Sequence, residues 1–304
     1  AAAVGSGGRP PLVRAQSHCH RRCGDRPGRR VRVGLRPLQP VYERLAPRAG
    51  RPLLKPFVYL LALAQPDQYS LASWVDDSPV TVQLGKNKRW TPANADRRSH
   101  GTVRLVDALA RSYNQATVRV GMQVEPDRLA QLIRVLAGIQ AEPNPALILG
   151  ATDQSPYAMA QLYQFLASGG EIQPLHAVRG VLDPQGRAIK RYDSVAPPAQ
   201  KGDAVAARLV GVALQYAVSS GTGRPLVRDG LGRLSAAGKT GTSESFRSAW
   251  FDGFTPQLAT AVGLYRSGPD GEELKMENLP DSGDITGGSY PTRIWTAYMK
   301  AALD

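Results

Sequence analysis

Three short motifs in this sequence carry side chains that can transfer protons or bind anions. They are Lys55, with Pro52 three residues before it, Ser112-Tyr113-Asn114, and Lys239-Thr240-Gly241-Thr242. A buried lysine can act as a base because burial depresses its pKa, and ammonium and hydroxyl groups together can bind a carboxylate. Residues three apart on a helix face each other, so a serine at position 52 would form a nucleophile–base pair with Lys55. The sequence has proline there.

Each motif also has an ordinary structural explanation when it is taken alone. Ser112 could satisfy a helix end and Asn114 could cap a turn. Lys239 could be a solvated strand residue, and Lys55 could lay its apolar stem along a helix start. A Ser-x-Asn triplet is expected by chance about once in a chain of this length. The choice between a functional and a structural explanation therefore depends on the order and the surroundings of the motifs.

Four helices are predicted from apolar periodicity and capping residues. Residues 56–64 are apolar on every side, which predicts a short helix buried all round with Lys55 at its start. Residues 125–137 repeat apolar side chains at helical spacing and end at Gly138. Ser155 and Asp203 are predicted N-caps of two further helices, the second running to about residue 218.

Strands are predicted mainly in the C-terminal half. Asp183-Pro184-Gln185-Gly186 is a type I turn sequence and predicts a hairpin that begins near residue 176. Residues 234–242, 249–254 and 258–265 are short apolar segments joined by turn-like links, as in an antiparallel meander. The predicted fold class is mixed α+β, with an antiparallel sheet flanked by helices.

The segments around the motifs resemble one protein family. They are WTPANADRRSHGTVRLVDALARSYNQATVRVG, LGATDQSPYAMAQLYQFLASGG, SSGTGR and AAGKTGTS. Together with Ser-x-Asn, Lys-Thr-Gly and the lysine of an otherwise incomplete Ser-x-x-Lys, they resemble the transpeptidase domain of class A, bifunctional penicillin-binding proteins, chiefly the 1B branch. The resemblance runs from about Leu53 to the end, although SAWFDGFTPQLATAVGLYR and ITGGSYPTRIWTAYMKAAL are more similar to another branch.

The resemblance implies a DD-peptidase or serine β-lactamase-like transpeptidase fold and an acyltransferase reaction. A serine attacks the D-alanyl-D-alanine end of a peptidoglycan stem peptide, D-alanine leaves, and an amine of a neighbouring peptide takes the acyl group. Lys55 is implied to be the base, Ser112 to relay a proton to the leaving amine, and Asn114 to hold the substrate amide. Stem peptides and β-lactam antibiotics are the implied partners, with no cofactor and no metal.

The third motif is implied to bind the substrate's terminal carboxylate from an edge strand. The ammonium of Lys239 and the hydroxyls of Thr240 and Thr242 are the groups that would pair with it. Gly241 would leave room for the substrate backbone against the strand.

Pro52 departs from the family pattern at the nucleophile. Proline has no hydroxyl, and it lacks the N–H that, with the N–H of Thr242, is implied to form the oxyanion hole. Proline is acceptable in the first turn of a helix, so we expect this copy to keep the fold and to be impaired as a transpeptidase. Its origin is either natural inactivation or a break in the reading frame near residue 52. A smaller departure is Ser248, where many relatives carry aspartate.

Residues 1–50 are predicted to be an unstructured basic leader, separate from a transpeptidase domain at 51–304. They hold eleven Arg, no Lys and two acidic residues, and hence nine of the net charge of +13. Their Arg, Gly, Pro and Ala show no sustained periodicity. A nucleic-acid or lipid contact of this leader and a metal site at Cys19 and Cys23 are the less favoured interpretations.

The family resemblance implies a place at the periplasmic face of the cytoplasmic membrane. The sequence has no signal-peptide pattern and no apolar run long enough to span a membrane, so we expect an anchor and an upstream glycosyltransferase domain outside this chain. A non-catalytic module that binds peptidoglycan or penicillin is the main alternative function. A serine β-lactamase is disfavoured, because no convincing Glu-x-x-x-Asn follows Ser-x-Asn to activate a deacylating water.

Overall fold

The structure is a computed structural model that describes residues 48–49, 52–86, 88–172, 175, 180–191, 202–226, 235–243, 246–270 and 272–303. Residues Ala46–Asp304 form one compact unit. Most of the predicted leader lies outside the described residues, but β1 (Arg48–Ala49) pairs with β6 (Asp153–Gln154). The division of the chain at residue 50 stays a prediction.

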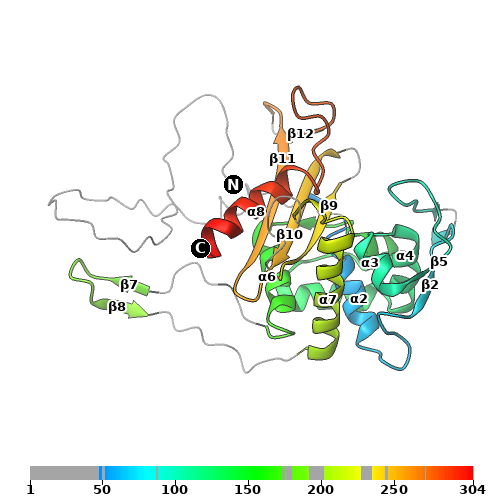
Figure 1. The fold of residues 1–304 in the computed structure, drawn as a ribbon, viewed down its shortest axis with the longest axis horizontal. Helices are drawn as coiled ribbons and strands as arrows, with labels where there is room; N and C mark the ends of the chain where they lie inside the picture. The colour runs from blue at the N-terminus through cyan, green and yellow to red at the C-terminus, as the bar shows by residue number, and fades with distance from the viewer. Residues whose placement is uncertain are drawn as a thin grey trace. The chain divides into compact units, whose positions relative to one another are not determined.

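The main sheet has four antiparallel strands in the order β12–β11–β10–β9 (Figure 1). They are β9 (Ala237–Thr242), β10 (Ser248–Phe254), β11 (Ala259–Ser267) and β12 (Glu273–Leu274). The predicted meander is confirmed as β9, β10 and β11, although residue 234 of its first segment lies outside the described residues. The Lys-Thr-Gly motif is on β9, at the edge of this sheet.

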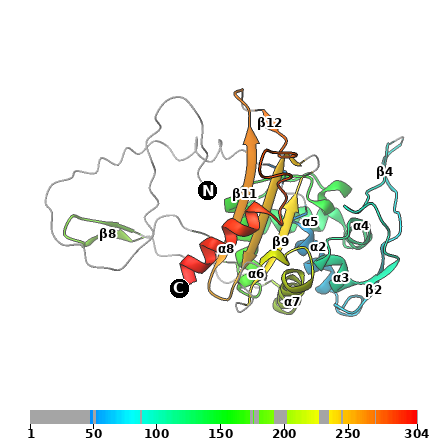
Figure 2. The ribbon, with the colours of Figure 1, turned by 45° about the horizontal axis from the view of Figure 1, so that its top comes forward.

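Helices cover both faces of the sheet (Figure 2). On one face lies α8 (Tyr290–Leu303), whose Trp295 meets Phe251 of β10 edge to face, with 5.2 Å between ring centroids. On the other lie α6 (Pro156–Ala167) and α7 (Ala204–Ser220). Every residue of β10 is buried, as expected for a strand that is covered on both faces.

The helix that carries Lys55 lies at the centre of the helical layer. This helix, α2 (Lys55–Leu63), is buried at every residue except Leu61. It is contacted by α7 and by α3 (Leu105–Ala110), α4 (Asn114–Gln123), α5 (Pro126–Ala137) and the 3-10 helix η1 (Pro145–Leu149). An apolar surface on all sides of α2 is what this position requires.

The predicted helix ends are confirmed in their capping contacts. The Oγ of Ser155 accepts the Ala158 N–H at 3.1 Å, and the Oδ1 of Asp203 accepts the Ala206 N–H at 2.9 Å. Gly138 ends α5 in the left-handed conformation at φ 68, which favours glycine because there is no Cβ to clash.

Three short hairpin-like sheets complete the described part of the chain. The predicted hairpin is confirmed as β7 (Gly180–Leu182) and β8 (Ala188–Arg191), with the Gly186 N–H bonded to the Asp183 carbonyl at 2.9 Å; its predicted start near residue 176 lies outside the described residues. The sequence did not predict β2 (Trp74–Asp76) with β5 (Thr102–Arg104), or β3 (Val82–Gly85) with β4 (Lys88–Trp90). These strands are too short for an alternating pattern to stand out.

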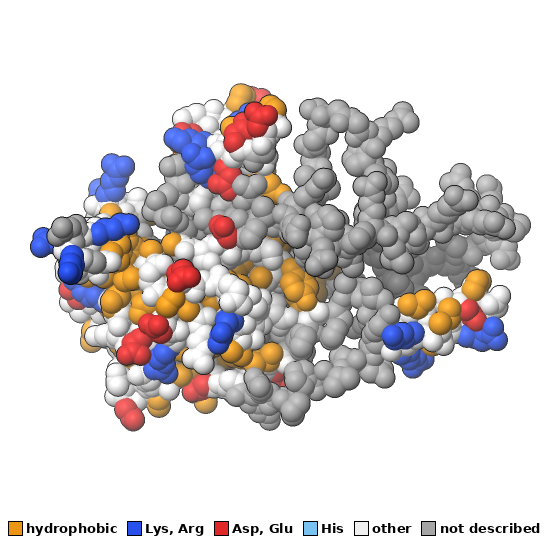
Figure 3. All heavy atoms as spheres, turned by 180° about the vertical axis from the view of Figure 1, so that it is seen from behind, with side chains coloured by type: hydrophobic (Ala, Val, Ile, Leu, Met, Phe, Trp, Pro, Cys, Tyr) orange, Lys and Arg blue, Asp and Glu red, His pale blue; other side chains and the backbone are white. Residues whose placement is uncertain are grey.

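On the face shown in Figure 3, Lys and Arg side chains are interspersed with Asp and Glu side chains. Among the helices that the structure describes, none has the length and apolar character needed to cross a membrane.

Candidate active site

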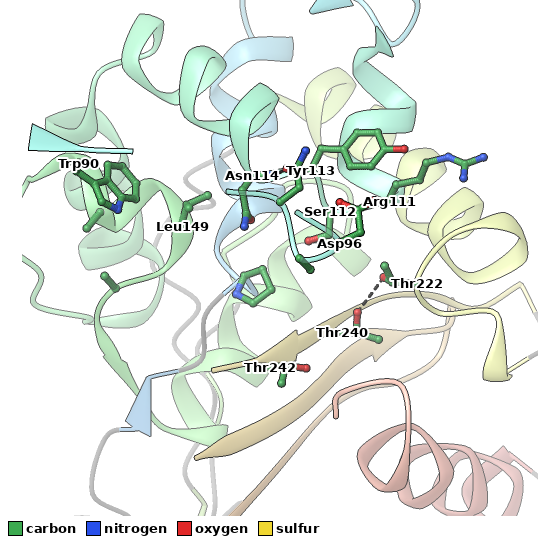
Figure 4. A pocket seen from close by; sticks show the side chains of 15 residues that line it. Trp90, Asp96, Arg111, Ser112, Tyr113, Asn114, Leu149, Thr222, Thr240 and Thr242 are labelled. Atoms are coloured by element: carbon green, nitrogen blue, oxygen red, sulfur yellow. Dashed lines mark hydrogen bonds between the residues drawn. The ribbon is translucent and has the colours of Figure 1, made fainter. Parts of the chain in front are cut away.

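A cleft of about 580 Å³ lies between the turn that precedes α4 and the edge strand β9. Ser112, Tyr113 and Asn114 line it on the helical side, and Thr240 and Thr242 line it on the strand side (Figure 4). The remaining lining residues are Pro52, Trp90, Asn94, Ala95, Asp96, Arg111, Ala146, Leu149, Ala151 and Thr222.

Lys55 joins the first two motifs. Its side chain is fully buried. The ammonium donates to the Ser112 carbonyl at 2.6 Å, to the Ser112 Oγ at 3.1 Å and to the Asn114 Oδ1 at 2.6 Å. The Lys55 N–H bonds to the Pro52 carbonyl at 3.2 Å, which places Pro52 one tight turn before α2 and next to this cluster.

The Ser112–Asn114 turn has a constrained backbone. Ser112 has φ 61, a left-handed conformation that is uncommon for a residue with a Cβ. This kink separates α3 from α4, so that the turn can face Lys55 while Asn114 begins α4. Such outliers persist where the surrounding contacts hold them, and here the three bonds from Lys55 do so.

The strand side of the cleft presents hydroxyl groups. The Thr240 Oγ1 donates to the Thr222 Oγ1 at 2.8 Å, and the Thr242 Oγ1 accepts the Gly287 N–H at 3.0 Å. Gly287 lies so close to β9 that a Cβ on it would be 2.6 Å from the Gly241 carbonyl oxygen. Lys239 is fully buried, and its ammonium donates to the Thr240 carbonyl at 3.0 Å.

Burial lowers the pKa of both lysines, so each binds its proton less tightly than an exposed lysine does. Desolvation, followed by the charge of Lys239, holds the pKa of Lys55 well below its ordinary value, while the Asp77 carboxylate raises it. Desolvation lowers the pKa of Lys239 to about 7. A lysine that is partly neutral near pH 7 can accept a proton, which an exposed lysine cannot do efficiently.

A buried carboxyl lies opposite Lys239 in the sheet register. Asp252 pairs with Lys239 across β9 and β10, yet neither of its oxygens has a hydrogen-bond partner of ordinary geometry among the described residues. Burial raises the pKa of Asp252 well above its ordinary value, with a weak opposing effect of the Val262 amide.

Some of the predicted site residues line the cleft, and others are buried. Pro52, Ser112, Asn114, Thr240 and Thr242 line the cleft, whereas the two lysines are buried beneath its surface. Gly241 is not among the lining residues, and it pairs with Trp250 of β10. Ser248 is buried in β10, where its N–H donates to the Ser243 Oγ at 2.7 Å. The chemical roles of all these residues stay predictions.

Sequence reasoning missed a second group of cleft residues. Trp90 and Leu149 lie toward one end of the cleft, and Arg111 lies toward the other (Figure 4). Asn94 and Asp96 also line it. The only sequence signal for these residues was their place inside two of the segments that carry the family resemblance, in which none of them was singled out.

Comparisons with known proteins identify the family of the chain. A family model, the penicillin binding protein transpeptidase domain, matches residues 53–278. Penicillin-binding protein 1B of Vibrio cholerae serotype O1 is 38% identical over 250 residues, which cover 82% of this chain and 30% of that protein. Penicillin-binding protein 1B of Escherichia coli K12 is 37% identical over 219 residues, covering 70% of this chain and 26% of that protein. The chain thus spans less than a third of the length of these relatives.

Solved structures show the same fold. Penicillin-binding protein 1A from Haemophilus influenzae superposes with a TM-score of 0.74 at 23% identity, covering 88% of this chain and 44% of that one. The PonA1 protein from Mycobacterium tuberculosis, solved in complex with penicillin V, superposes with a TM-score of 0.69 at 25% identity, covering 86% of this chain and 70% of that one.

Proposed function

Because this chain belongs to the transpeptidase family of penicillin-binding proteins, we propose that its cleft binds D-alanyl-D-alanine stem peptides and β-lactams without forming an acyl-enzyme. By family the domain is a serine-type DD-transpeptidase of peptidoglycan synthesis. The proposal separates two properties of the site, the ability to bind and the ability to acylate.

One observation carries the proposal. The Lys55 ammonium is bonded to both Ser112 and Asn114, which line the cleft together with Pro52. In an intact site, Lys55 would take the proton of a serine at position 52, and Ser112 would pass a proton on to the leaving amine. All parts of this relay are present except the hydroxyl that would start it.

Pro52 removes two contributions to catalysis. Without a hydroxyl there is no covalent route, and without an N–H the oxyanion hole keeps only the amide of Thr242. One such donor is worth about 2.7 to 4 kcal/mol of transition-state stabilisation. The ground-state groups that bind substrate are unaffected by this change.

Binding is supported by the charges and hydroxyls around the cleft. The hydroxyls of Thr240 and Thr242 and the guanidinium of Arg111 line the cleft and favour a ligand with a carboxylate. The ammonium of Lys239, which is buried and bonded to the Thr240 carbonyl, would add a positive charge. A stem peptide ends in such a group, and penicillin carries one as well. The periplasmic face of the cytoplasmic membrane is where this substrate would be met, so we place the domain there.

The test is labelling of the purified protein with a fluorescent penicillin, with Pro52→Ser and Pro52→Ala as a matched pair. We expect no covalent label on the Pro52 protein, label approaching one per chain on Pro52→Ser, and none on Pro52→Ala, which regains only the N–H. Adding Lys55→Met to Pro52→Ser should abolish the label, because no base remains. Stoichiometric labelling of the Pro52 protein would refute the loss of acylation.

Binding is tested separately by equilibrium titration of the Pro52 protein with an acetylated D-alanyl-D-alanine tripeptide. Binding that is lost in Lys239→Met supports the proposal. Failure of the Pro52 protein to bind either the tripeptide or penicillin would overturn it.

A further inference from the structure

Asp77, in the loop after β2, is a fully buried carboxylate with a complete set of donors. Its Oδ1 accepts the Ala116 N–H at 3.0 Å. Its Oδ2 accepts from the Asn94 side-chain amide at 2.6 Å and from the His100 N–H at 3.2 Å, and lies 2.8 Å from the His100 Nδ1. An unpaired buried carboxylate is strongly destabilising, so a set of donors this full indicates a site built around the charge.

One donor to Asp77, the Ala116 N–H, belongs to the first turn of α4. The residue before this helix, Tyr113, has no side-chain cap of its own. Instead, the Asn94 Oδ1 accepts the N–H of Asn114 at 2.6 Å and that of Gln115 at 3.3 Å, while Asp77 accepts that of Ala116. Asn94 and Asp77 therefore cap α4 from outside the helix, and a carboxylate is favourable at a helix N-terminus.

This cap fixes the side chain that Lys55 binds. The Asn114 Nδ2 donates to the Ala93 carbonyl at 2.6 Å, so its Oδ1 is left to face Lys55. Lys55 is thus held by a turn whose position depends on Asp77. Two charged groups act on Lys55 from the packed elements, the ammonium of Lys239 on β9 and the carboxylate of Asp77, and their effects have opposite signs.

His100 extends the same network to the rim of the cleft. Its Nε2 lies 3.1 Å from Asp96 Oδ2, and its ring stacks on Tyr113 with 3.9 Å between centroids. A neutral imidazole has one N–H and can donate to only one of the two carboxylates, so both contacts are hydrogen bonds only for the imidazolium. Asp77 is connected in this way to two residues that line the cleft.

We propose that Asp77 is a positioning residue, which through Asn94 and α4 fixes the Ser112–Asn114 turn and with it the oxygens that accept from the Lys55 ammonium. The proposal deepens the proposed function and rests on it for the effect on ligand binding. Its effect on Lys55 does not depend on any ligand.

The experiment is the titration of Lys55 by NMR in protein labelled with ¹³C at lysine Cε, with the resonance assigned by Lys55→Met. Asp77→Asn keeps the shape and removes the charge, and Asp76→Asn is the control, because Asp76 is the adjacent half-exposed carboxylate. We expect Lys55 to titrate at lower pH in Asp77→Asn than in the parent, and Asp76→Asn to match the parent. An unchanged Lys55 titration in folded Asp77→Asn would overturn the proposal.

Tripeptide binding gives the second readout. Asp77→Asn should weaken it by about tenfold or more, the effect of losing a charge-assisted contact that orients the site. If Asp77→Asn does not fold, Asn94→Ala keeps the carboxylate and its bond from the Ala116 N–H but removes the link through Asn94 to the Asn114 and Gln115 amides. Unchanged tripeptide binding in that variant would overturn the proposal. If the parent binds no tripeptide, the proposed function fails, while the Lys55 titration still decides the role of Asp77.

Discussion

Replacing Lys239 with methionine should make the protein more stable at neutral pH and unable to bind substrate. Methionine has nearly the volume of lysine without the ammonium, so it fills the same buried space. The change removes an ammonium group that would be more stable in water than in the buried site. A gain in stability from removing a site residue is the usual sign of strain kept for function.

The size of the expected gain in stability follows from the shift in the pKa of Lys239. Its pKa is about 7 in the folded protein and 10.5 in the unfolded chain, so the unfolded chain binds more protons between these values and stability rises with pH across that window. The penalty for the buried ammonium is complete below pH 7, at about 5 kcal/mol, and falls to about 2 kcal/mol at pH 9. The lost bond to the Thr240 carbonyl offsets about 1 kcal/mol of the gain.

The assay is urea unfolding of the parent and Lys239→Met at pH 6 and pH 9. We expect the variant to gain about 3 to 4 kcal/mol in free energy of unfolding at pH 6 and about 1 kcal/mol at pH 9. The reasoning would be refuted if the variant lost about 3 to 5 kcal/mol at both pH values. That result would mean that Lys239 forms a buried ion pair with Asp252, its cross-strand neighbour, and that methionine leaves the carboxylate alone.

Three further predictions concern the scaffold. Asp252→Asn should raise the free energy of unfolding at pH 7 more than at pH 4, since burial raises the pKa of this carboxyl and its penalty grows as pH rises above the unfolded value of 3.8; equal gains in urea unfolding at both pH values would contradict this. Ser155→Ala should lower the free energy of unfolding by about 1 kcal/mol in the same assay, because the bond to the Ala158 N–H is lost. An unchanged free energy of unfolding would show that Ser155 does not cap the helix. Gly287→Ala should cost about 1 to 3 kcal/mol, read as a lower Tm, because its Cβ would meet the Gly241 and Trp250 carbonyl oxygens at 2.6 and 2.5 Å; a wild-type Tm would show that β9 can move aside.

The elements with strong local signals were predictable from the sequence. The helix after Ser155 and the one after Asp203 have caps that bond to nearby amides, and the apolar residues 56–64 form the buried helix that they predicted. The order of the three motifs also predicted that Lys55 would lie near Ser112 and Asn114. These features depend on contacts within a few residues, or on a family pattern that had already placed them.

The network behind the motifs was not predictable in the same way. Asp77 is separated from Ala116 by 39 positions, and its neighbour Asp76 is an exposed residue of the same type. Nothing in the sequence tells which of the two carboxylates turns inward. The burial of Lys239 beneath the cleft also escaped prediction, because a lysine on an edge strand is normally solvated.

The central place of α2 has a consequence for how the site responds to heat or denaturant. A helix enclosed by α3, α4, α5 and α7 offers no surface from which it can fray, so its amides should exchange with solvent only when the whole domain opens. The residue best suited to act as a base is therefore anchored in the slowest-exchanging part of the protein.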